Sequence, residues 1–172
     1  MTDSRSPGGG FPSAVANAVK TSVENTFSVI CGEKPIHQAN GHDAGNCPCV
    51  VGIISFVGGI PWSLSLVLPE ETAPALAQKF TGMEIPFDTP DMGDVAAELV
   101  NVLAGEVTAQ LDRSQIKAQM SLPTVARGKP LELMGERRAA VERLDFTTKQ
   151  GKFWLRLIST GSGQSLARLP GT

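Results

Sequence analysis

The sequence predicts an α+β fold, with two long helices packed on an antiparallel or mixed β-sheet. Segments 13–31 and 90–111 each place apolar residues along one side of a helix. Segments 50–68 and 141–159 each have the pattern of two β-strands joined by a glycine-containing turn. Because one chain combines helices with antiparallel hairpins, we expect the helices to cover a face of the sheet.

Length and composition predict a single domain and argue against nucleic-acid binding. The chain has 172 residues, of which 41% are hydrophobic, and this suits one domain with a sizeable core. We expect residues 1–10, rich in Ser, Gly and Pro, to be disordered, residues 11–160 to form the domain, and residues 161–172 to be a flexible tail. A net charge of −2 provides no basic field for nucleic acid. Residues 1–10 lack a signal-peptide pattern, so we expect a cytoplasmic protein.

The first predicted helix covers residues 13–31 and should face the core. It is expected to end at Gly32, a residue that favours helix C-termini, with Pro35 soon after. Residues 36–38 then form a short edge strand. The apolar side of the helix carries Val15, Val19, Val23, Phe27 and Ile30.

Residues 44–69 contain no charged side chain, which raises the question of a membrane-spanning helix. The run of 26 residues exceeds the roughly 20 needed to cross a bilayer. However, Pro61 would interrupt a helix, and apolar residues alternate with serines from Trp62 onward. Gly58 and Gly59 are typical of a two-residue hairpin turn. We therefore predict a buried hairpin with strands at 50–57 and 60–68 and no membrane insertion.

The remaining elements follow in a mixed order. Thr89, Pro90 and Asp91 mark the start of the second long helix, which should run to about Leu111. The last hairpin is expected to turn at Gln150 and Gly151. The further predicted segments are a short helix at 71–80, a loop at 82–90, strands at 116–121, 141–148 and 152–159, and a weak strand at 131–134.

The second long helix carries a narrow polar stripe opposite its apolar side. At about 100° per residue, the members of this stripe fall within roughly 40° of one line. The helix should therefore bury its apolar side and present the stripe to solvent or to a partner. The stripe consists of Asp94, Glu98, Asn101, Gly105, Thr108 and Asp112, and the apolar side of Val95, Leu99, Val100, Leu103, Ala104, Val107 and Leu111.

The stripe resembles the signature of the CheX/CheC family of chemotaxis phosphatases. That signature has an acidic or serine residue, then E-x-x-N on a helix, then a proline some twenty residues later. Here these positions are Asp94, Glu98, Asn101 and Pro123, and the segment ending at Gly105 also resembles the family. Including the first helix and the turn after it, the similarity covers roughly residues 11–159. One departure is Ala97, which stands where relatives often have glycine.

The resemblance implies an enzyme that hydrolyses the phospho-aspartate of a CheY-like receiver domain in two-component signalling. It assigns Asn101 to positioning the attacking water and Glu98 to pairing with a lysine of the receiver. Asp94, Gly105 and Thr108 would line the partner-binding surface with Glu98. The required Mg²⁺ would be held by the receiver itself, so this chain would need no cofactor or metal site. No covalent intermediate on this chain is expected.

Each of these residues also has a structural interpretation. Asp94 in the first turn is favoured by the helix dipole, and Glu98 would be ordinary on a solvated face. Pro123 can shape a turn after a strand, and Gly105 can allow a close approach. Asn101 differs, because Asn is a poor helix former in mid-helix and this cost has no evident packing benefit.

His37, His42, Cys47 and Cys49 form the competing candidate, a zinc site in the loop before the first hairpin. Their spacing is poor, since one residue rather than two separates the cysteines and no second cysteine pair exists. We expect Cys49 and Cys31 to be buried as small apolar residues. The sequence contains neither a nucleophile-elbow motif nor a phosphate-binding P-loop.

Two function classes therefore remain open. The first is a phosphatase acting on a phosphorylated receiver, and the second is a non-catalytic module of the same fold that binds a receiver or another signalling protein. Intact Glu98 and Asn101 favour the enzyme. Only one E-x-x-N lies in a plausible helix, so the chain resembles the single-site CheX type, for which the resemblance implies a homodimer.

Overall fold

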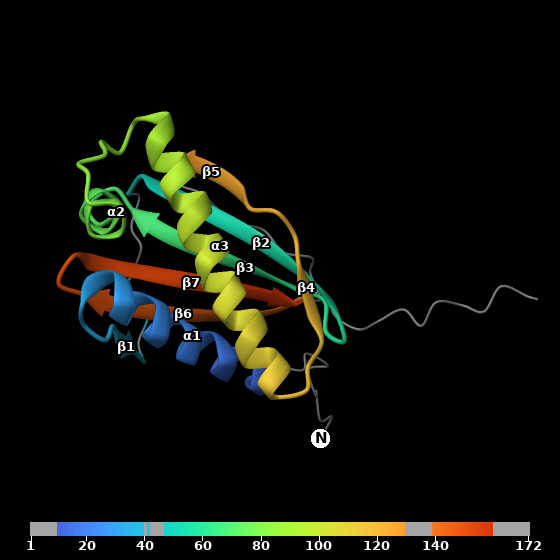
Figure 1. The fold of residues 1–172 in the computed structure, drawn as a ribbon. Helices are drawn as coiled ribbons and strands as arrows, with labels where there is room; N and C mark the ends of the chain where they lie inside the picture. The colour runs from blue at the N-terminus through green and yellow to red at the C-terminus, as the bar shows by residue number, and fades with distance from the viewer. Residues whose placement is uncertain (1–9, 40, 42–46, 130–138, 160–172) are drawn as a thin grey trace, which may run out of the picture.

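The computed structural model describes residues 10–39, 41, 47–129 and 139–159. Within them, three helices lie on one face of a seven-stranded antiparallel sheet (Figure 1). The predicted α+β fold is confirmed, and the sheet is antiparallel rather than mixed in the paired strands described. The predicted disorder of residues 1–9, the weak strand at 131–134 and the tail at 161–172 lie outside the described residues.

The elements follow the predicted order, with one strand that the sequence did not predict. The sheet order is β1-β6-β7-β3-β2-β4, and β5 pairs with β2 as well. The helices are α1 (Ser13–Cys31), α2 (Ala73–Thr81) and α3 (Pro90–Arg113), and the strands are β1 (Ile36–Gln38), β2 (Cys49–Gly58), β3 (Trp62–Pro69), β4 (Ala118–Met120), β5 (Thr124–Gly128), β6 (Ala140–Thr148) and β7 (Gly151–Ser159).

The main core lies between the sheet and the inner sides of α1 and α3. Val15, Val19 and Val23 of α1 are fully buried, as predicted, and the helix ends at Gly32 in the left-handed conformation with φ 71°. Phe27 stacks on Phe153 of β7 with ring centroids 4.4 Å apart. Burial of this apolar surface provides the main driving force for placing both helices on the sheet.

The charge-free run folds as the β2–β3 hairpin, and no helix among the described residues is long and apolar enough to span a membrane. The predicted two-residue turn at Gly58 and Gly59 is wrong, because Phe56 pairs with Trp62 and the connection between these two residues is longer. Gly58 remains in β2, where it pairs with Ala118 of β4. There a Cβ would lie 2.3 Å from the Lys117 carbonyl oxygen, so close backbone approach requires glycine.

The last hairpin turns one residue earlier than predicted. Thr148 pairs with Gly151, so the turn residues are Lys149 and Gln150. Gly151 has φ 134°, and a Cβ on it would lie 2.4 Å from the Thr72 hydroxyl oxygen. A glycine is therefore needed at the start of β7, because the backbone there packs closely against Thr72, the residue before α2.

Helix α3 packs directly on β2 at Gly52. A Cβ on Gly52 would lie 2.7 Å from Val100 Cγ1 and 2.8 Å from the Ala96 carbonyl oxygen. Glycine is therefore the residue that lets the helix backbone approach the strand this closely. The contact fixes which side of α3 faces the sheet.

A polar contact with α1 holds α3 from its other flank. Asn25 Nδ2 donates to Glu106 Oε1 at 2.9 Å, and Gln110 Nε2 donates to the same oxygen at 2.8 Å. The hydrogen bond from Asn25 and then that from Gln110 stabilise the charged carboxylate and lower the pKa of Glu106. Together with the contact at Gly52, this pair sets the rotation of α3 about its axis.

We predict that Gly52→Ala destabilises the fold, because the new methyl group would overlap Val100 and the α3 backbone. Overpacking of this kind costs about 1–3 kcal/mol. Urea unfolding measures the loss. Gly59→Ala is the matched control, since a Cβ there meets no atom within 4 Å and its stability should change by less than about 0.5 kcal/mol. Equal stability of both variants would contradict a close helix–strand contact.

Candidate functional site

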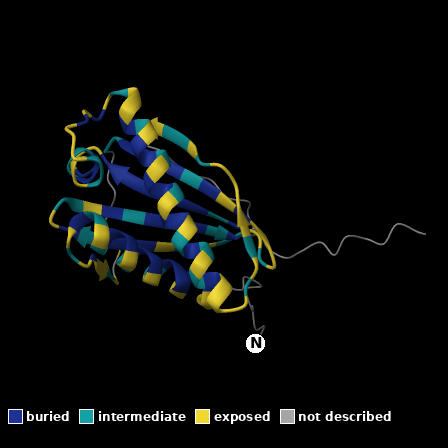
Figure 2. Cartoon of the chain, viewed as in Figure 1, coloured by how far each residue is buried: buried dark blue, intermediate teal, exposed yellow. Residues whose placement is uncertain are grey.

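Helix α3 buries its apolar side and exposes the polar stripe, as the sequence predicts. Figure 2 shows exposed residues along the outward side of α3 and buried ones toward the sheet. Asp94, Glu98 and Gly105 are exposed, while Asn101 and Thr108 are half-buried. The residues predicted to be buried, Val95, Leu99, Val100, Leu103, Ala104, Val107 and Leu111, are all buried.

Asp94, Glu98 and Asn101 retain their full hydrogen-bonding capacity. Within the described part of the chain, no hydrogen bond or ion pair engages the side chain of any of the three. On a helix, residues three apart have Cβ atoms about 5–6 Å from each other, so Glu98 and Asn101 can act on one small group. A carboxylate accepts hydrogen bonds, and a carboxamide both donates and accepts. The stripe therefore offers, one helical turn apart, a carboxylate that accepts hydrogen bonds and a carboxamide that both donates and accepts them.

The C-terminal end of the stripe is partly satisfied within the chain. Thr108 Oγ1 donates to the Ala104 carbonyl oxygen at 2.9 Å, which leaves this hydroxyl an acceptor for a partner. Asp112 binds Lys117 Nζ at 2.9 Å. The hydrogen bond and the charge of Lys117 lower the pKa of Asp112. The uncompensated negative charge of the stripe therefore lies at Asp94 and Glu98, toward the N-terminal half of the helix.

The N-terminal end of α3 is held by its neighbours. Pro90 occupies the first turn, as predicted, but the Thr89 hydroxyl donates to the Pro86 carbonyl oxygen at 2.8 Å instead of capping the helix. Arg127 of β5 donates to the Thr89 carbonyl oxygen, and its guanidinium lies 5.5 Å from the centre of the Phe87 ring. Arg127 thus connects the start of α3 to the sheet edge.

Strands β4 and β5 form one edge that runs beside α3, as Figure 1 shows. Met120 pairs with Phe56, and Val125 pairs with Gly52. From the first of these pairs to the second, the edge advances by five residues, whereas β2 advances by four. The extra residue makes a β-bulge, and Pro123 lies within it. Pro123 therefore belongs to the bulge rather than to a turn after a strand, which suits a residue that cannot donate to the ladder.

The sequence-based zinc hypothesis gains no support from the described residues. They contain no group of three or more side chains able to hold a metal ion, and His42 lies outside them. Cys49 is buried in β2, and Cys31 is buried in the main core, both as predicted. His37 packs against Phe146 with ring centroids 5.3 Å apart.

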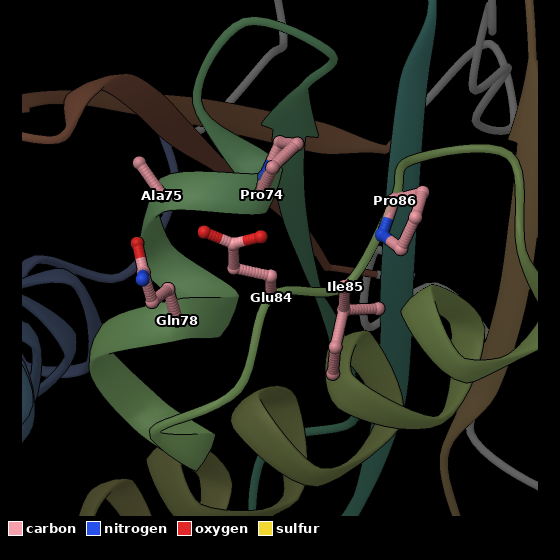
Figure 3. Close-up of a pocket in the computed structure, with 6 residues that line it drawn as sticks. All are labelled: Pro74, Ala75, Gln78, Glu84, Ile85 and Pro86. Carbon is pink, nitrogen blue, oxygen red and sulfur yellow. The ribbon is translucent and has the colours of Figure 1, made fainter.

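A surface pocket of about 390 Å³ lies between α2 and the loop before α3. Figure 3 shows the Glu84 carboxylate pointing toward α2, between Pro74 and Gln78. Ile85 and Pro86 complete the lining on the loop side. Among the described residues that line this pocket, Glu84 is the only titratable one, so they provide no acid–base pair. The polar stripe of α3 remains the better candidate.

Comparison with protein families finds a match over a range of the chain that contains α3 and the β4–β5 edge. Residues 50–147 match the family model described as "Chemotaxis phosphatase CheX". This range includes Glu98 and Asn101 together with Pro123. A comparison with curated proteins finds no match.

Solved structures of similar fold come from several bacteria. A CheC-like superfamily protein from Shewanella sp. PV-4 has a TM-score of 0.76 at 20% identity, covering 88% of this chain and 100% of that one. The chemotaxis protein CheX from Desulfovibrio desulfuricans has a TM-score of 0.72 at 22% identity, with 84% and 98% covered. A Borrelia burgdorferi structure, a CheX–CheY–BeF3–Mg²⁺ complex, has a TM-score of 0.64 at 17% identity, with 86% and 95% covered.

We predict that Gly105→Ala stabilises the fold. Gly105 lies inside α3, and a Cβ there would meet no atom within 4 Å, so nothing in the fold requires glycine. Replacing an exposed helical Gly by Ala should add about 0.5–1 kcal/mol to the free energy of unfolding. Urea unfolding measures this change. A loss of stability would mean that the fold, and not a partner, needs the glycine.

Proposed function

Because the chain belongs to the CheX family of chemotaxis phosphatases, we propose that it hydrolyses the phospho-aspartate of a CheY-like receiver domain. The exposed stripe of α3 would dock beside the phosphorylated residue. The chain would then supply only part of the active site, and the receiver would supply the phosphoryl group and its Mg²⁺. A neighbour of the same fold, from Borrelia burgdorferi, is a complex of CheX with CheY, and this supports a receiver as the partner.

The observation that carries the proposal is the unused hydrogen-bonding capacity of Glu98 and Asn101. Both side chains stand on a rigid helix, face away from the core, and have no side-chain partner among the described residues. A carboxamide in mid-helix lowers helix stability relative to alanine. Its presence on an exposed line, beside a glycine that the fold does not need, is better explained by a partner than by packing.

The chemistry requires little from this chain. An acyl phosphate is already activated, so hydrolysis needs a water placed in line with the phosphorus and stabilisation of the charge on the phosphoryl oxygens. Positioning alone can lower a barrier by several kcal/mol, of the order of 7–11 in well-oriented model reactions. A helix that is fixed on the sheet can provide such positioning without a metal or a nucleophile of its own.

Asn101 is suited to hold the attacking water. Its carbonyl oxygen can accept a hydrogen bond from the water, and its N–H group can donate one to the water or to a phosphoryl oxygen. The carboxamide has no charge to change with pH, so the geometry of the water stays constant across the physiological range. Asn101 is half-buried, which restricts its side chain more than full exposure would.

Glu98 is suited to fix the register of the docked receiver. Its exposed carboxylate can pair with a cation of the partner, and a charge pair of this kind sets orientation and speeds association. Asp94, one turn earlier, would add to the same field. Gly105 would let the partner backbone approach α3 closely, since no side chain covers the helix there.

Three further expectations stay predictions. The homodimer and the cytoplasmic location rest on the resemblance and on the sequence pattern. The Mg²⁺ is expected to belong to the receiver, as part of the substrate. The adaptor alternative would use the same docking surface but would have no need for the Asn101 carboxamide.

We predict that the wild-type protein accelerates decay of a phosphorylated CheY-like receiver in the presence of Mg²⁺. Asn101→Ala should lower this acceleration by about 100-fold while binding changes little, because only the placement of the water is lost. Glu98→Ala should weaken both binding and acceleration. Loss of radiolabelled phosphate from the receiver, followed over time, measures the rates, and titration with a beryllofluoride-activated receiver measures binding.

Asn17→Ala is the matched control, since Asn17 is an exposed asparagine on α1 that lies outside the stripe. This variant should keep wild-type activity. Neither Asn101→Ala nor Glu98→Ala should reduce stability, because alanine is a better helix former. Binding without acceleration by the wild type would replace the phosphatase with the adaptor. Activity retained in Asn101→Ala would refute the role assigned to the carboxamide.

A further inference from the structure

We propose that Leu122, in the bulge between β4 and β5, is an apolar anchor for the receiver that docks on α3. This inference rests on the proposed function and deepens it. It extends the docking surface from the helix to the sheet edge. It also requires the receiver to present an apolar patch next to a cationic group. No sequence pattern singles out Leu122.

The geometry of α3 places Asn101 on the side of the helix that faces the bulge. Thr108 Oγ1 lies 3.9 Å from Met120 Sδ, so the line of Thr108 faces the β4–β5 edge. Asn101 precedes Thr108 by seven residues, about two turns, and therefore lies on nearly the same line. Glu98 lies further round the helix, toward open solvent.

The edge strand and the helix run in opposite directions, which sets the level of Leu122. Gly93, near the start of α3, lies against Val125, whereas Thr108 lies against Met120. From Thr108 to Asn101 the helix rises about 10 Å. An extended chain covers about the same distance from Met120 to Pro123. Leu122, one residue before Pro123, therefore lies beside the segment of α3 between Asn101 and Thr108, near its Asn101 end.

Leu122 is unusually exposed for a residue beside a sheet. Its relative exposure is 87%, and that of Met120 in the same edge is 37%. A single exposed leucine is ordinary on a protein surface, so exposure alone decides nothing. Here the exposed leucine lies on the edge beside α3, where the side chains of Asp94, Glu98 and Asn101 also have no partner among the described residues.

The local structure holds Leu122 in a defined position. The Ser121 backbone N–H donates to the Ser55 carbonyl oxygen at 2.9 Å, and the Ser55 N–H donates to Ser121 Oγ at 3.1 Å. Ser121 Oγ in turn donates to the Leu122 carbonyl oxygen at 2.8 Å. Pro123 follows with its φ angle fixed by the ring. A bulge commonly re-aims one side chain, and a side chain whose backbone is held in this way needs little ordering on binding.

The partner chemistry follows from the two neighbouring groups. Leu122 lies within one residue of the level of Asn101, and its side chain projects into solvent. A globular domain that brings a phosphoryl group to Asn101 should therefore also cover Leu122. Glu98 and Asp94 lie on the side of Asn101 that is away from Leu122, and their carboxylates would pair with a cationic group of the partner. The receiver should therefore place an apolar patch on one side of its phospho-aspartate and a basic group on the other.

We predict that Leu122→Ala raises the Kd for a beryllofluoride-activated receiver with Mg²⁺ by about tenfold, the effect expected for losing most of a buried leucine side chain. At saturating receiver, the maximal rate of dephosphorylation should stay within twofold of wild type, since Leu122 does not hold the water. Ile36→Ala is the matched control, because Ile36 has 63% relative exposure in β1, at the opposite end of the sheet from β4. Its Kd should not change.

The outcomes separate this inference from the proposed function. If the wild type accelerates decay and Leu122→Ala binds with a Kd within twofold of wild type, the anchor is refuted and the phosphatase stands. If Ile36→Ala loses affinity tenfold as well, the anchor is also refuted. If the wild type neither binds the receiver nor accelerates its decay, the proposed function fails and the anchor fails with it.

Discussion

The close contact between α3 and β2 at Gly52 is the constraint on which the surface of this protein depends. Because Val100 and the Ala96 carbonyl occupy the space that a Cβ would need, the helix has one way to sit on the strand. The hydrogen bond from Asn25 to Glu106 fixes its other flank. With the rotation of α3 set, Glu98 and Asn101 must face outward, where they can act on a partner.

The sheet edge provides the second side of this surface. Strands β4 and β5 run along α3 and are interrupted by a bulge, where Ser121 is held by two hydrogen bonds to Ser55. The bulge also disrupts an edge that could otherwise pair with another strand. In this view the chain contributes shape and a few oriented polar groups, and the reacting phosphoryl group would arrive with the partner.

Helical periodicity made the exposed side of α3 predictable and the family resemblance singled out Glu98 and Asn101 on it, whereas the features around them depend on long-range packing. A 3.6-residue repeat is a local property, so the buried and exposed sides of α3 could be assigned from the sequence. Strand β5 was missed because its five residues carry no clear apolar alternation and end in Gly128. The turn at Gly58 was placed too early because that glycine is needed for contact with Lys117, which no local pattern reveals.

The most direct test is to map the docking surface by NMR. The ¹⁵N-labelled protein would be titrated with a beryllofluoride-activated receiver and Mg²⁺, and the backbone amide shifts followed. We predict that the largest changes fall in residues 94–108 of α3 and 120–123 of the bulge. Changes confined to β1 and β6 around Ile36, or no changes at all, would contradict a docking surface on α3 and the bulge.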